Sequence, residues 1–203
     1  MAKIQIMKRL ILVAIAVMLA LPAWAAPIPL KDLSAYLNSL TTAQAAFRQE
    51  NADGSRAKGI LYIKRPGRAR FEYAAPDKSL VMAGGGQVAI FDAKSNQPPE
   101  QYPLKRTPLN LILARKVDLA TAKMVVGHGE VNGTTRVIAQ DPEKPEYGTI
   151  ELVFSANPIA LSEWIITDDM GGKTKVMLDD FTTGMNLSAF LFDITYETRQ
   201  RQK

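Results

Sequence analysis

Cysteine is absent from the 203 residues of this chain, and histidine occurs once. Without cysteine the chain can form neither disulfide bonds nor thiolate metal sites, so its fold must rest on buried apolar surface. The one histidine, His128 between two glycines, is more typical of a loop or strand edge than of a metal ligand or catalytic base. The sequence therefore does not favour a Ser-His-Asp catalytic triad. We expect that the protein is not an enzyme and that it binds no metal and no cofactor.

Long hydrophobic runs are also scarce, and the one present lies near the N-terminus. The unbroken apolar run Leu10–Leu21 follows a short basic segment and precedes Ala23-Trp24-Ala25, which has the form of a signal-peptidase site. A membrane anchor is the weaker interpretation, because a span takes roughly 20 apolar residues. We predict a signal peptide over residues 1–25, cleaved after Ala25, and one exported domain over 26–203.

Excess positive charge becomes small once that segment is removed. The whole chain has 25 Lys and Arg against 20 Asp and Glu, a formal net charge of +5. Lys3, Lys8 and Arg9 lie in the predicted signal peptide, which has no acidic residue, so 22 basic and 20 acidic residues remain, a net charge of +2. Nucleic-acid binding needs a concentrated basic surface, and we expect no nucleic-acid partner.

What the chain does have is a period of two along most of its length. Short apolar–polar alternations are separated by turn residues, which predicts an antiparallel meander and not βαβ units. The expected strands are Thr42–Glu50, Gly59–Arg65, Ala69–Tyr73, Ser79–Ala83, Gln87–Phe91, Met124–Gly127, Thr134–Gln140, Thr149–Ser155, Ile159–Thr167, Lys173–Asp180 and Phe190–Thr195.

Helical spacing occurs before and within this series. Leucines recur at helical intervals over Pro29–Leu40, which predicts either an ordinary docking helix or a cover over an apolar opening. After a loop over Ser95–Arg106, Thr107-Pro108 is suited to start a second helix over Leu109–Arg115, and Asp118–Lys123 could form a third. A long sheet with few helices must twist or curl, and helices across its concave side would enclose an apolar pocket.

Arg65 is the residue that this pattern explains least. Counting by twos places it on the same face as Leu61 and Ile63, which should face a core or cavity. A guanidinium on an apolar wall is unfavourable unless its donors find acceptors. Arg65 is therefore either a charge at a strand end that reaches water or a latch directed across an apolar space.

Several short motifs, in this order and spacing, resemble the family of periplasmic outer-membrane lipoprotein carriers, the LolA family. The resemblance covers nearly the whole chain after the predicted signal peptide. The motifs are Phe47-Arg48-Gln49, Lys64-Arg65-Pro66, Phe71-Glu72-Tyr73 with Pro76, Val88–Asp92 and Thr107-Pro108-Leu109.

The resemblance implies a mainly β (α+β) fold: a single curved antiparallel sheet of about eleven strands, an unclosed β-barrel, covered by two or three short helices around an apolar cavity. It implies a periplasmic monomer that takes acylated lipoprotein cargo from an inner-membrane ABC transporter and delivers it to an outer-membrane receptor, if one is present. In the family, the arginine at the position of Arg65 bonds to the helical lid and keeps the empty form closed. The acyl chains would contact Leu33, Leu37, Phe47, Leu61, Ile63, Phe71, Tyr73, Phe91, Leu109, Ile112, Ile150, Leu152, Phe154, Trp164 and Ile166.

The chain also departs from the family pattern. Ala69 and Ala89 stand where family members commonly carry aromatic residues, and we expect both differences to make the pocket roomier or its grip on a ligand weaker. The tail Thr195–Lys203 lacks the expected Pro-Gly pattern.

Two other functions compete with a carrier. A LolA-like module could bind or sense lipid or lipoprotein without ferrying it. An exported hydrolase is supported only by His128 and by the acid pairs Asp168-Asp169 and Asp179-Asp180, which are more typical of solvated turns. The triplet Gly84–Gly86 is a weak phosphate-loop candidate, because no Lys-Ser/Thr follows it.

Overall fold

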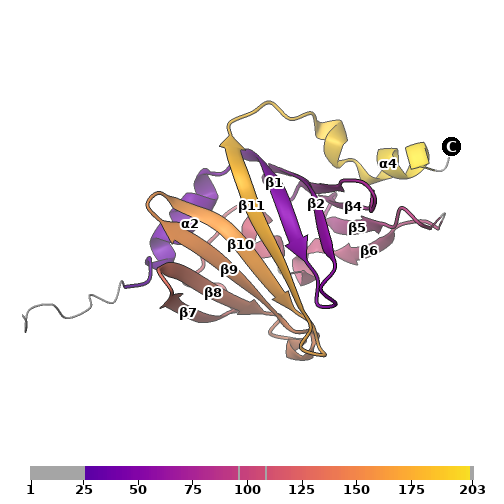
Figure 1. Cartoon of the computed structure of the whole chain (residues 1–203). Coiled ribbons are helices and arrows are strands. Elements are labelled where there is room, and N and C mark those ends of the chain that lie inside the picture. The colour runs from indigo at the N-terminus through magenta and orange to yellow at the C-terminus, as the bar shows by residue number, and fades with distance from the viewer. Residues whose placement is uncertain (1–25, 96, 108, 202–203) are drawn as a thin grey trace, which may run out of the picture.

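A single curved antiparallel sheet of eleven strands dominates the computed structural model, which describes residues 26–95, 97–107 and 109–201 (Figure 1). The strand order is β6-β5-β4-β3-β2-β1-β11-β10-β9-β8-β7, so β6 and β7 are the two edges and the described sheet is an unclosed barrel, as predicted. The strands are β1 (Thr42–Glu50), β2 (Arg56–Lys64), β3 (Ala69–Tyr73), β4 (Leu80–Gly84), β5 (Gln87–Phe91), β6 (Glu100–Pro103), β7 (Val125–Val131), β8 (Thr134–Gln140), β9 (Thr149–Ala156), β10 (Ile159–Thr167) and β11 (Lys173–Thr183).

Three α-helices and three 3₁₀ turns accompany the sheet in the described residues. Two of the helices belong to the inner side of the sheet, whereas the C-terminal helix lies apart from them (Figure 1). The helical elements are α2 (Leu30–Ser39), η1 (Leu104–Arg106), α3 (Leu109–Leu113), η2 (Pro145–Tyr147), η3 (Ala189–Phe192) and α4 (Ile194–Arg201). Among the described residues, no helix combines the length and the apolar character needed to cross a bilayer.

The inner face of the sheet carries the main core. Leu61 pairs with Phe71 across β2 and β3, and Phe47 of β1 lies opposite Gly59, where an added Cβ would meet the Phe47 ring and the Glu72 carbonyl. The ring centroids of Phe47 and Phe71 are 5.9 Å apart in an edge-on arrangement, which aromatic quadrupoles favour. The main core therefore depends on strand alternation and on one glycine that leaves room for an aromatic ring.

A second apolar cluster lies on the outer face of β4 and β5. Leu80, Met82, Ala89 and Phe91 are all buried there, packed against Ile194 of α4. The C-terminal segment covers this cluster, and it is held at its edge by Arg70, which contacts the Leu191 carbonyl oxygen (3.1 Å) and Glu197 (2.9 Å). The sheet is thus covered by helices on both faces over part of its area.

Three secondary-structure predictions were wrong. Phe190–Thr195 is not a strand: it forms η3 and the start of α4, where the Phe192 carbonyl and the Ile194 side chain pack against Gly84 of β4 on the outer face of the sheet. The predicted loop contains β6, which pairs with β5 despite its prolines, as an edge strand permits. Asp118–Lys123 is a turn, where the Asp118 carboxylate accepts a hydrogen bond from the Ala120 amide and competes with helix formation.

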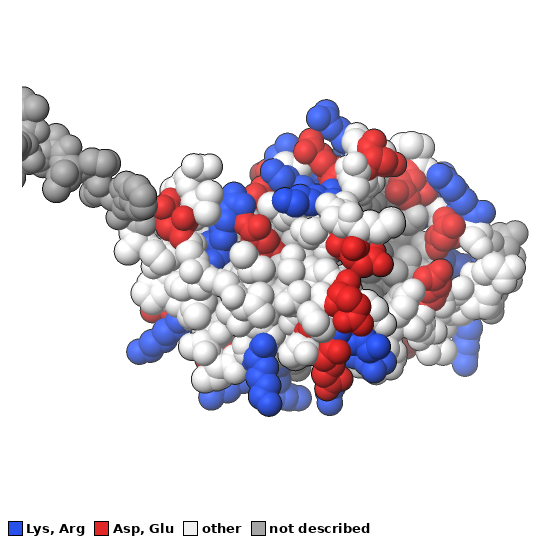
Figure 2. Space-filling view, turned by 90° about the horizontal axis from the view of Figure 1, so that it is seen from below, with Lys and Arg blue, Asp and Glu red and all other residues white. Residues whose placement is uncertain are grey.

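The surface carries charges of both signs. In the view from below, acidic side chains cross the middle of the face and basic side chains lie mostly around them (Figure 2). This mixture agrees with the small net charge calculated without residues 1–25. Residues 1–25 and Pro108, which belong to the predicted signal peptide and helix start, lie outside the described residues.

Candidate functional site

An apolar cavity of about 330 Å³ lies between the inner face of the sheet and α3. Strands from both halves of the sheet contribute to its wall, and aromatic rings line one side: the centroids of Phe71 and Trp164 are 5.9 Å apart. Its volume lies near the small end of the range for ligand pockets, about 300–1,000 Å³. The lining residues are Gln49, Phe71, Tyr73, Val81, Thr107, Leu109, Ile112, Ile150, Trp164, Ile166, Thr174 and Val176.

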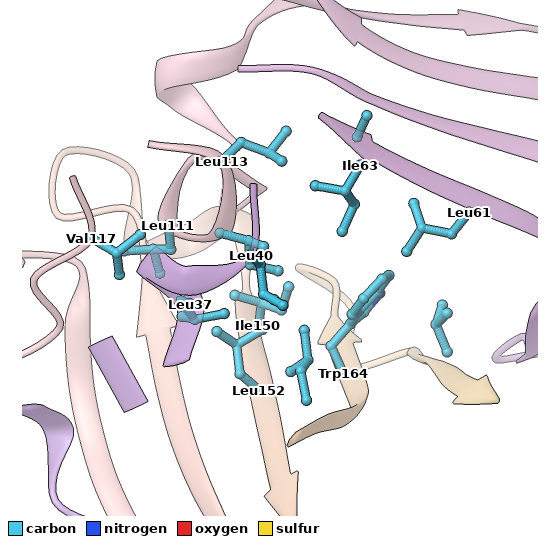
Figure 3. Close-up of a cluster of buried hydrophobic side chains, with 14 of the residues drawn as sticks. Leu37, Leu40, Leu61, Ile63, Leu111, Leu113, Val117, Ile150, Leu152 and Trp164 are labelled. Atoms are coloured by element: carbon cyan, nitrogen blue, oxygen red, sulfur yellow. The ribbon is translucent and has the colours of Figure 1, made fainter. Parts of the chain in front are cut away.

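Helix α2 closes the core beside this cavity. Its leucine stripe is buried, and Figure 3 shows Leu37 and Leu40 directed toward Ile150, Leu152 and Trp164 of the sheet. A side chain from the same helix also bonds to the sheet, because the hydroxyl of Tyr36 accepts a hydrogen bond from the Leu161 amide at 3.1 Å. Burial raises the pKa of this hydroxyl. The helix packs on the core beside the cavity and contributes no residue to its lining, so its role as a cover over an apolar opening stays a prediction.

Two polar residues join α2 to the chain that follows α3. The Ser34 hydroxyl accepts a hydrogen bond from the Leu119 amide (3.0 Å), and Asn38 exchanges two hydrogen bonds with the backbone of Val117 (2.8 and 2.9 Å). Helix α2 and residues 109–119 therefore form one connected layer, which we call the lid.

Arg65 connects the lid to the sheet. Its guanidinium donates to the carbonyl oxygens of Leu37 and Ala114 and to Asn38 Oδ1 (3.2 Å). The two carbonyls lie at the C-terminal ends of α2 and α3, where unpaired acceptors and the helix dipole favour a cation. The adjoining turn adds a backbone bond from the Gly67 amide to the Leu113 carbonyl at 2.8 Å.

The burial of Arg65 is incompletely compensated. Its Nε has no hydrogen-bond partner among the described residues, and burial lowers the pKa of its guanidinium from the usual value. An arginine remains charged in proteins nevertheless. The guanidinium is thus a charged contact between sheet and lid with an incomplete set of partners.

A polar rim borders the cavity on the side of the β1–β2 hairpin. The Tyr73 hydroxyl donates to Gln49 Oε1 (2.8 Å), and Gln49 Nε2 donates to Asn51 Oδ1 (2.6 Å). Burial, with a contribution from the charge of Asp77, raises the pKa of Tyr73 to about 12. The phenol is therefore neutral at physiological pH and serves as a hydrogen-bond donor at the end of an otherwise apolar wall.

The structure places the fifteen predicted contact residues in three locations. Seven line the cavity: Phe71, Tyr73, Leu109, Ile112, Ile150, Trp164 and Ile166. Seven others belong to the same core next to it: Leu33, Leu37, Phe47, Leu61, Ile63, Leu152 and Phe154.

Phe91 was predicted to contact the acyl chains, but it does not line the cavity. It lies in the outer cluster, because β5 directs its odd-numbered residues away from the cavity, and Arg201 stacks 5.2 Å from its ring. The same alternation corrects the expectation for Ala89, which is also in the outer cluster and cannot enlarge the pocket. Ala69 does lie in the inner core.

Sequence reasoning missed the polar contacts of the lid. The leucine spacing alone was used to predict the helix, but Ser34 is also buried, and Ser34 and Asn38 both face the chain after α3. Their spacing of four residues, one helical turn along the edge of the leucine stripe, was the available signal.

The other candidate residues perform structural roles. His128 Nε2 lies 2.9 Å from the Ile28 carbonyl oxygen at the edge strand β7. Asp168 accepts hydrogen bonds from the Met170 and Gly172 amides within a turn, and Asp179 forms an ion pair with Arg48 at 2.7 Å. The Asp168 contacts agree with the turn interpretation of Asp168-Asp169, whereas Asp179-Asp180 lie within strand β11, beside a register shift, and not in a turn.

Comparison with known proteins agrees with this architecture. The model of the family described as "Outer membrane lipoprotein carrier protein LolA" matches residues 38–195. The outer-membrane lipoprotein carrier protein of Methylococcus capsulatus is 26% identical over 179 residues, covering 82% of this chain and 83% of that protein. The carrier protein of Chromobacterium violaceum is 28% identical over 172 residues, covering 81% of each.

Among solved structures, a LolA superfamily protein from Nitrosomonas europaea covers 83% of this chain and 99% of its own, with a TM-score of 0.44 and 10% identity. The family match spans most of the chain, from the end of α2 to the start of α4. The chain therefore belongs to the LolA family of outer membrane lipoprotein carrier proteins.

Proposed function

We propose that this protein is a periplasmic carrier that holds the acyl chains of lipoproteins between the sheet and the lid. The observation that carries the proposal is an apolar cavity beside a lid that the charged side chain of Arg65 joins to the sheet. A site of this kind offers apolar contact and no catalytic group, which suits transport of an acylated molecule and not its conversion.

The energies of latch and cargo are of comparable size. Hydrogen bonds to a charged group contribute about 1.5–3 kcal/mol each, so three of them contribute at most about 5–9 kcal/mol. Burying acyl chain contributes about 0.8 kcal/mol per methylene. About six to eleven buried methylenes would therefore offset the latch. The closed cavity is small for several acyl chains, so loading would move the lid outward and break the contacts of Arg65.

The route of the cargo forms the second part of the proposal. Residues 1–25 would direct export and be removed, which leaves a single domain, 26–203, in the periplasm. There the carrier would receive lipoproteins from an inner-membrane ABC transporter and deliver them to the outer membrane, through a receptor where one is present. The names of its relatives, outer-membrane lipoprotein carrier proteins, support this route.

A single tryptophan makes the cavity directly observable. Of the two tryptophans, Trp24 lies in the segment proposed to be removed, so protein 26–203 contains only Trp164, which lines the cavity. Acylated peptide with bromine atoms along its acyl chain should quench Trp164 fluorescence saturably at one-to-one stoichiometry. The same peptide without bromine should compete, and the unacylated peptide should not. Absence of quenching at saturating lipopeptide would refute an acyl-chain site in this cavity.

A transfer assay separates a carrier from a module that binds without ferrying. Loaded protein is mixed with outer-membrane vesicles, and lipopeptide in the vesicle fraction is measured over time. Loss of quenching together with arrival of lipopeptide in the vesicles supports a carrier. Tight binding with no delivery would favour the sensing alternative.

A further inference from the structure

A groove outside the sheet adjoins the acyl-chain cavity at the β1–β2 hairpin. Its volume is about 780 Å³, and its lining differs from that of the cavity because most of its members are polar or charged. It is lined by Arg48, Gln49, Glu50, Asn51, Ser55, Arg56, Ala57, Lys58, Ala74, Ala75, Pro76, Asp77, Lys94 and Met177.

Gln49 lies on the boundary between these two spaces and lines both of them. Its side-chain oxygen accepts a hydrogen bond from the Tyr73 hydroxyl on the cavity side, and its side-chain nitrogen donates one to Asn51 on the groove side. Asn51 in turn donates to the Ser55 hydroxyl at 2.9 Å, within the hairpin that forms one wall of the groove. A line of hydrogen-bonding side chains therefore leads from the apolar cavity into the polar groove.

The charges of the groove favour an anionic occupant. Arg48 is neutralised by Asp179 at 2.7 Å, and Arg56 lies 3.1 Å from Glu50. Lys58 and Lys94 are exposed and form no ion pair within the described part of the chain. Asp77 also lines the groove and forms no ion pair within the described part of the chain, so the two lysines leave a small local excess of positive charge.

We infer that this groove binds the polypeptide of the cargo where it leaves the cavity, as an extended segment with acidic side chains that pair with Lys58 and Lys94. This inference rests on the proposed acyl-chain function and extends it to the polar part of the same ligand. An acylated protein joins apolar chains to a hydrated peptide, and an apolar cavity beside a polar groove, with Gln49 lining both, matches that division. The peptide amides would find hydrogen-bond partners in Gln49, Asn51 and Ser55.

The test compares lipopeptides that share one brominated acyl group and differ in the linker after it. One linker contains aspartates, one contains only serine and glycine, and one contains lysines; binding to protein 26–203 is read by quenching of Trp164. The acidic linker should bind about ten-fold tighter than the neutral linker at low ionic strength, with the difference shrinking as salt screens the lysines. The basic linker should bind most weakly.

Charge reversal assigns the preference to the groove. In the double variant Lys58→Glu/Lys94→Glu, the preference for the acidic linker should disappear, while affinity for the neutral linker stays within about two-fold of wild type. The control variant Lys105→Glu/Lys123→Glu makes the same change in charge at exposed lysines outside the groove and the lid and should keep the preference. If the groove variant keeps the wild-type preference, or if the wild type has none, the inference is wrong.

Two further outcomes separate this inference from related ones. If no lipopeptide quenches Trp164, the acyl-chain function itself fails. If quenching occurs without any effect of the linker, only the groove assignment fails. Phosphatidylglycerol vesicles without peptide test whether a lipid headgroup occupies the groove. If the wild type binds these vesicles but shows no linker preference, and the groove variant loses vesicle binding, the occupant of the groove is a membrane surface and not the cargo peptide.

Discussion

The substitution Arg65→Leu should release the lid without unfolding the sheet. Leucine removes the contacts to the Leu37 and Ala114 carbonyls and to the Asn38 side chain. Leucine also matches the apolar neighbours Leu61 and Ile63 on the same face, so the sheet loses little. The perturbation therefore acts on the junction between two layers and not on either layer alone.

The expected size follows from the contacts of this side chain. Three charged hydrogen bonds would contribute about 5–9 kcal/mol at the upper limit, but several features reduce the net value. The guanidinium is half-buried and its Nε is unpaired, and the Leu37 carbonyl keeps a second bond from the Leu40 amide at 3.3 Å. We expect a net loss of about 3 kcal/mol in lid closure, which corresponds to roughly a 100-fold change in the opening equilibrium.

Amide hydrogen exchange in the empty protein measures this equilibrium directly. Protection of the amides in α2 should fall by about 100-fold, while amides in the centre of β9 and β10 keep their wild-type protection. Unchanged protection in α2 would refute the latch. An equal fall in α2 and in the strands would mean that Arg65 stabilises the whole fold and holds no separate lid.

Two companion variants sharpen the measurement. Arg68→Leu removes the same charge from the same turn, but among the described residues Arg68 donates only to the Lys64 carbonyl (3.2 Å), so lid protection should not change. Arg65→Lys should recover only part of the protection, because an ammonium lacks the planar fork that reaches carbonyls on two helices. Full recovery by lysine would show that charge alone, and not the geometry of the guanidinium, closes the lid.

Three other predictions concern the C-terminal segment and the cavity rim. Gly84→Ala should detach the C-terminal segment, because the added Cβ would meet the Phe192 carbonyl. Trypsin should then cleave α4 faster while its cleavage pattern elsewhere stays unchanged, and wild-type cleavage kinetics would contradict the packing of the C-terminal segment on β4. Burial acts to raise the pKa of Glu197, but hydrogen bonds from Arg201 and Arg70 outweigh it and hold this pKa below its usual value. The stabilising effect of the Glu197 carboxylate is therefore complete above the unfolded pKa of about 4.3 and is lost as pH falls through the lower folded pKa. Acid should release α4 from the sheet in the wild type, as seen in the NMR spectrum of the methyl groups of α4. Glu197→Gln should weaken the packing of α4 on the sheet at neutral pH and remove the pH dependence of its release. Tyr73 should ionise near pH 12 in an ultraviolet difference titration against Tyr73→Phe, and ionisation near the exposed value of about 10 would show that water reaches its hydroxyl.

Errors in the predicted strands show where local pattern fails. Eleven strands were expected and eleven are found, but one expected strand, Phe190–Thr195, is a helical segment, and β6 was missed. Phe190, Phe192 and Ile194 recur at every second position as in a strand, whereas Glu100–Pro103 has no apolar alternation and ends in proline. Their conformation depends on what each one packs against: the outer face of β4 for the first and the free edge of β5 for the second.

The two faces of a strand present a different difficulty. Alternation shows that Val88 and Phe91 lie on opposite faces of β5, but it does not show which face is the cavity. In most strands the other face is polar, which resolves the ambiguity. In β4 and β5 both faces are apolar because the C-terminal segment covers the outer one, so Phe91 and Ala89 were assigned to the wrong side.

Local periodicity and residue chemistry were enough to predict the antiparallel sheet, the leucine-lined first helix and the anomaly of Arg65, because these depend on neighbouring residues. The folded chain was needed to show which acceptors Arg65 reaches, that Ser34 and Asn38 bind the chain after α3, and that Gln49 lines both an apolar cavity and a polar groove. These contacts join residues far apart in the chain, and nothing in local periodicity encodes which distant backbone group a side chain will meet. The contacts between lid and sheet, and the position of Gln49 between the two spaces, are consequences of how the sheet folds.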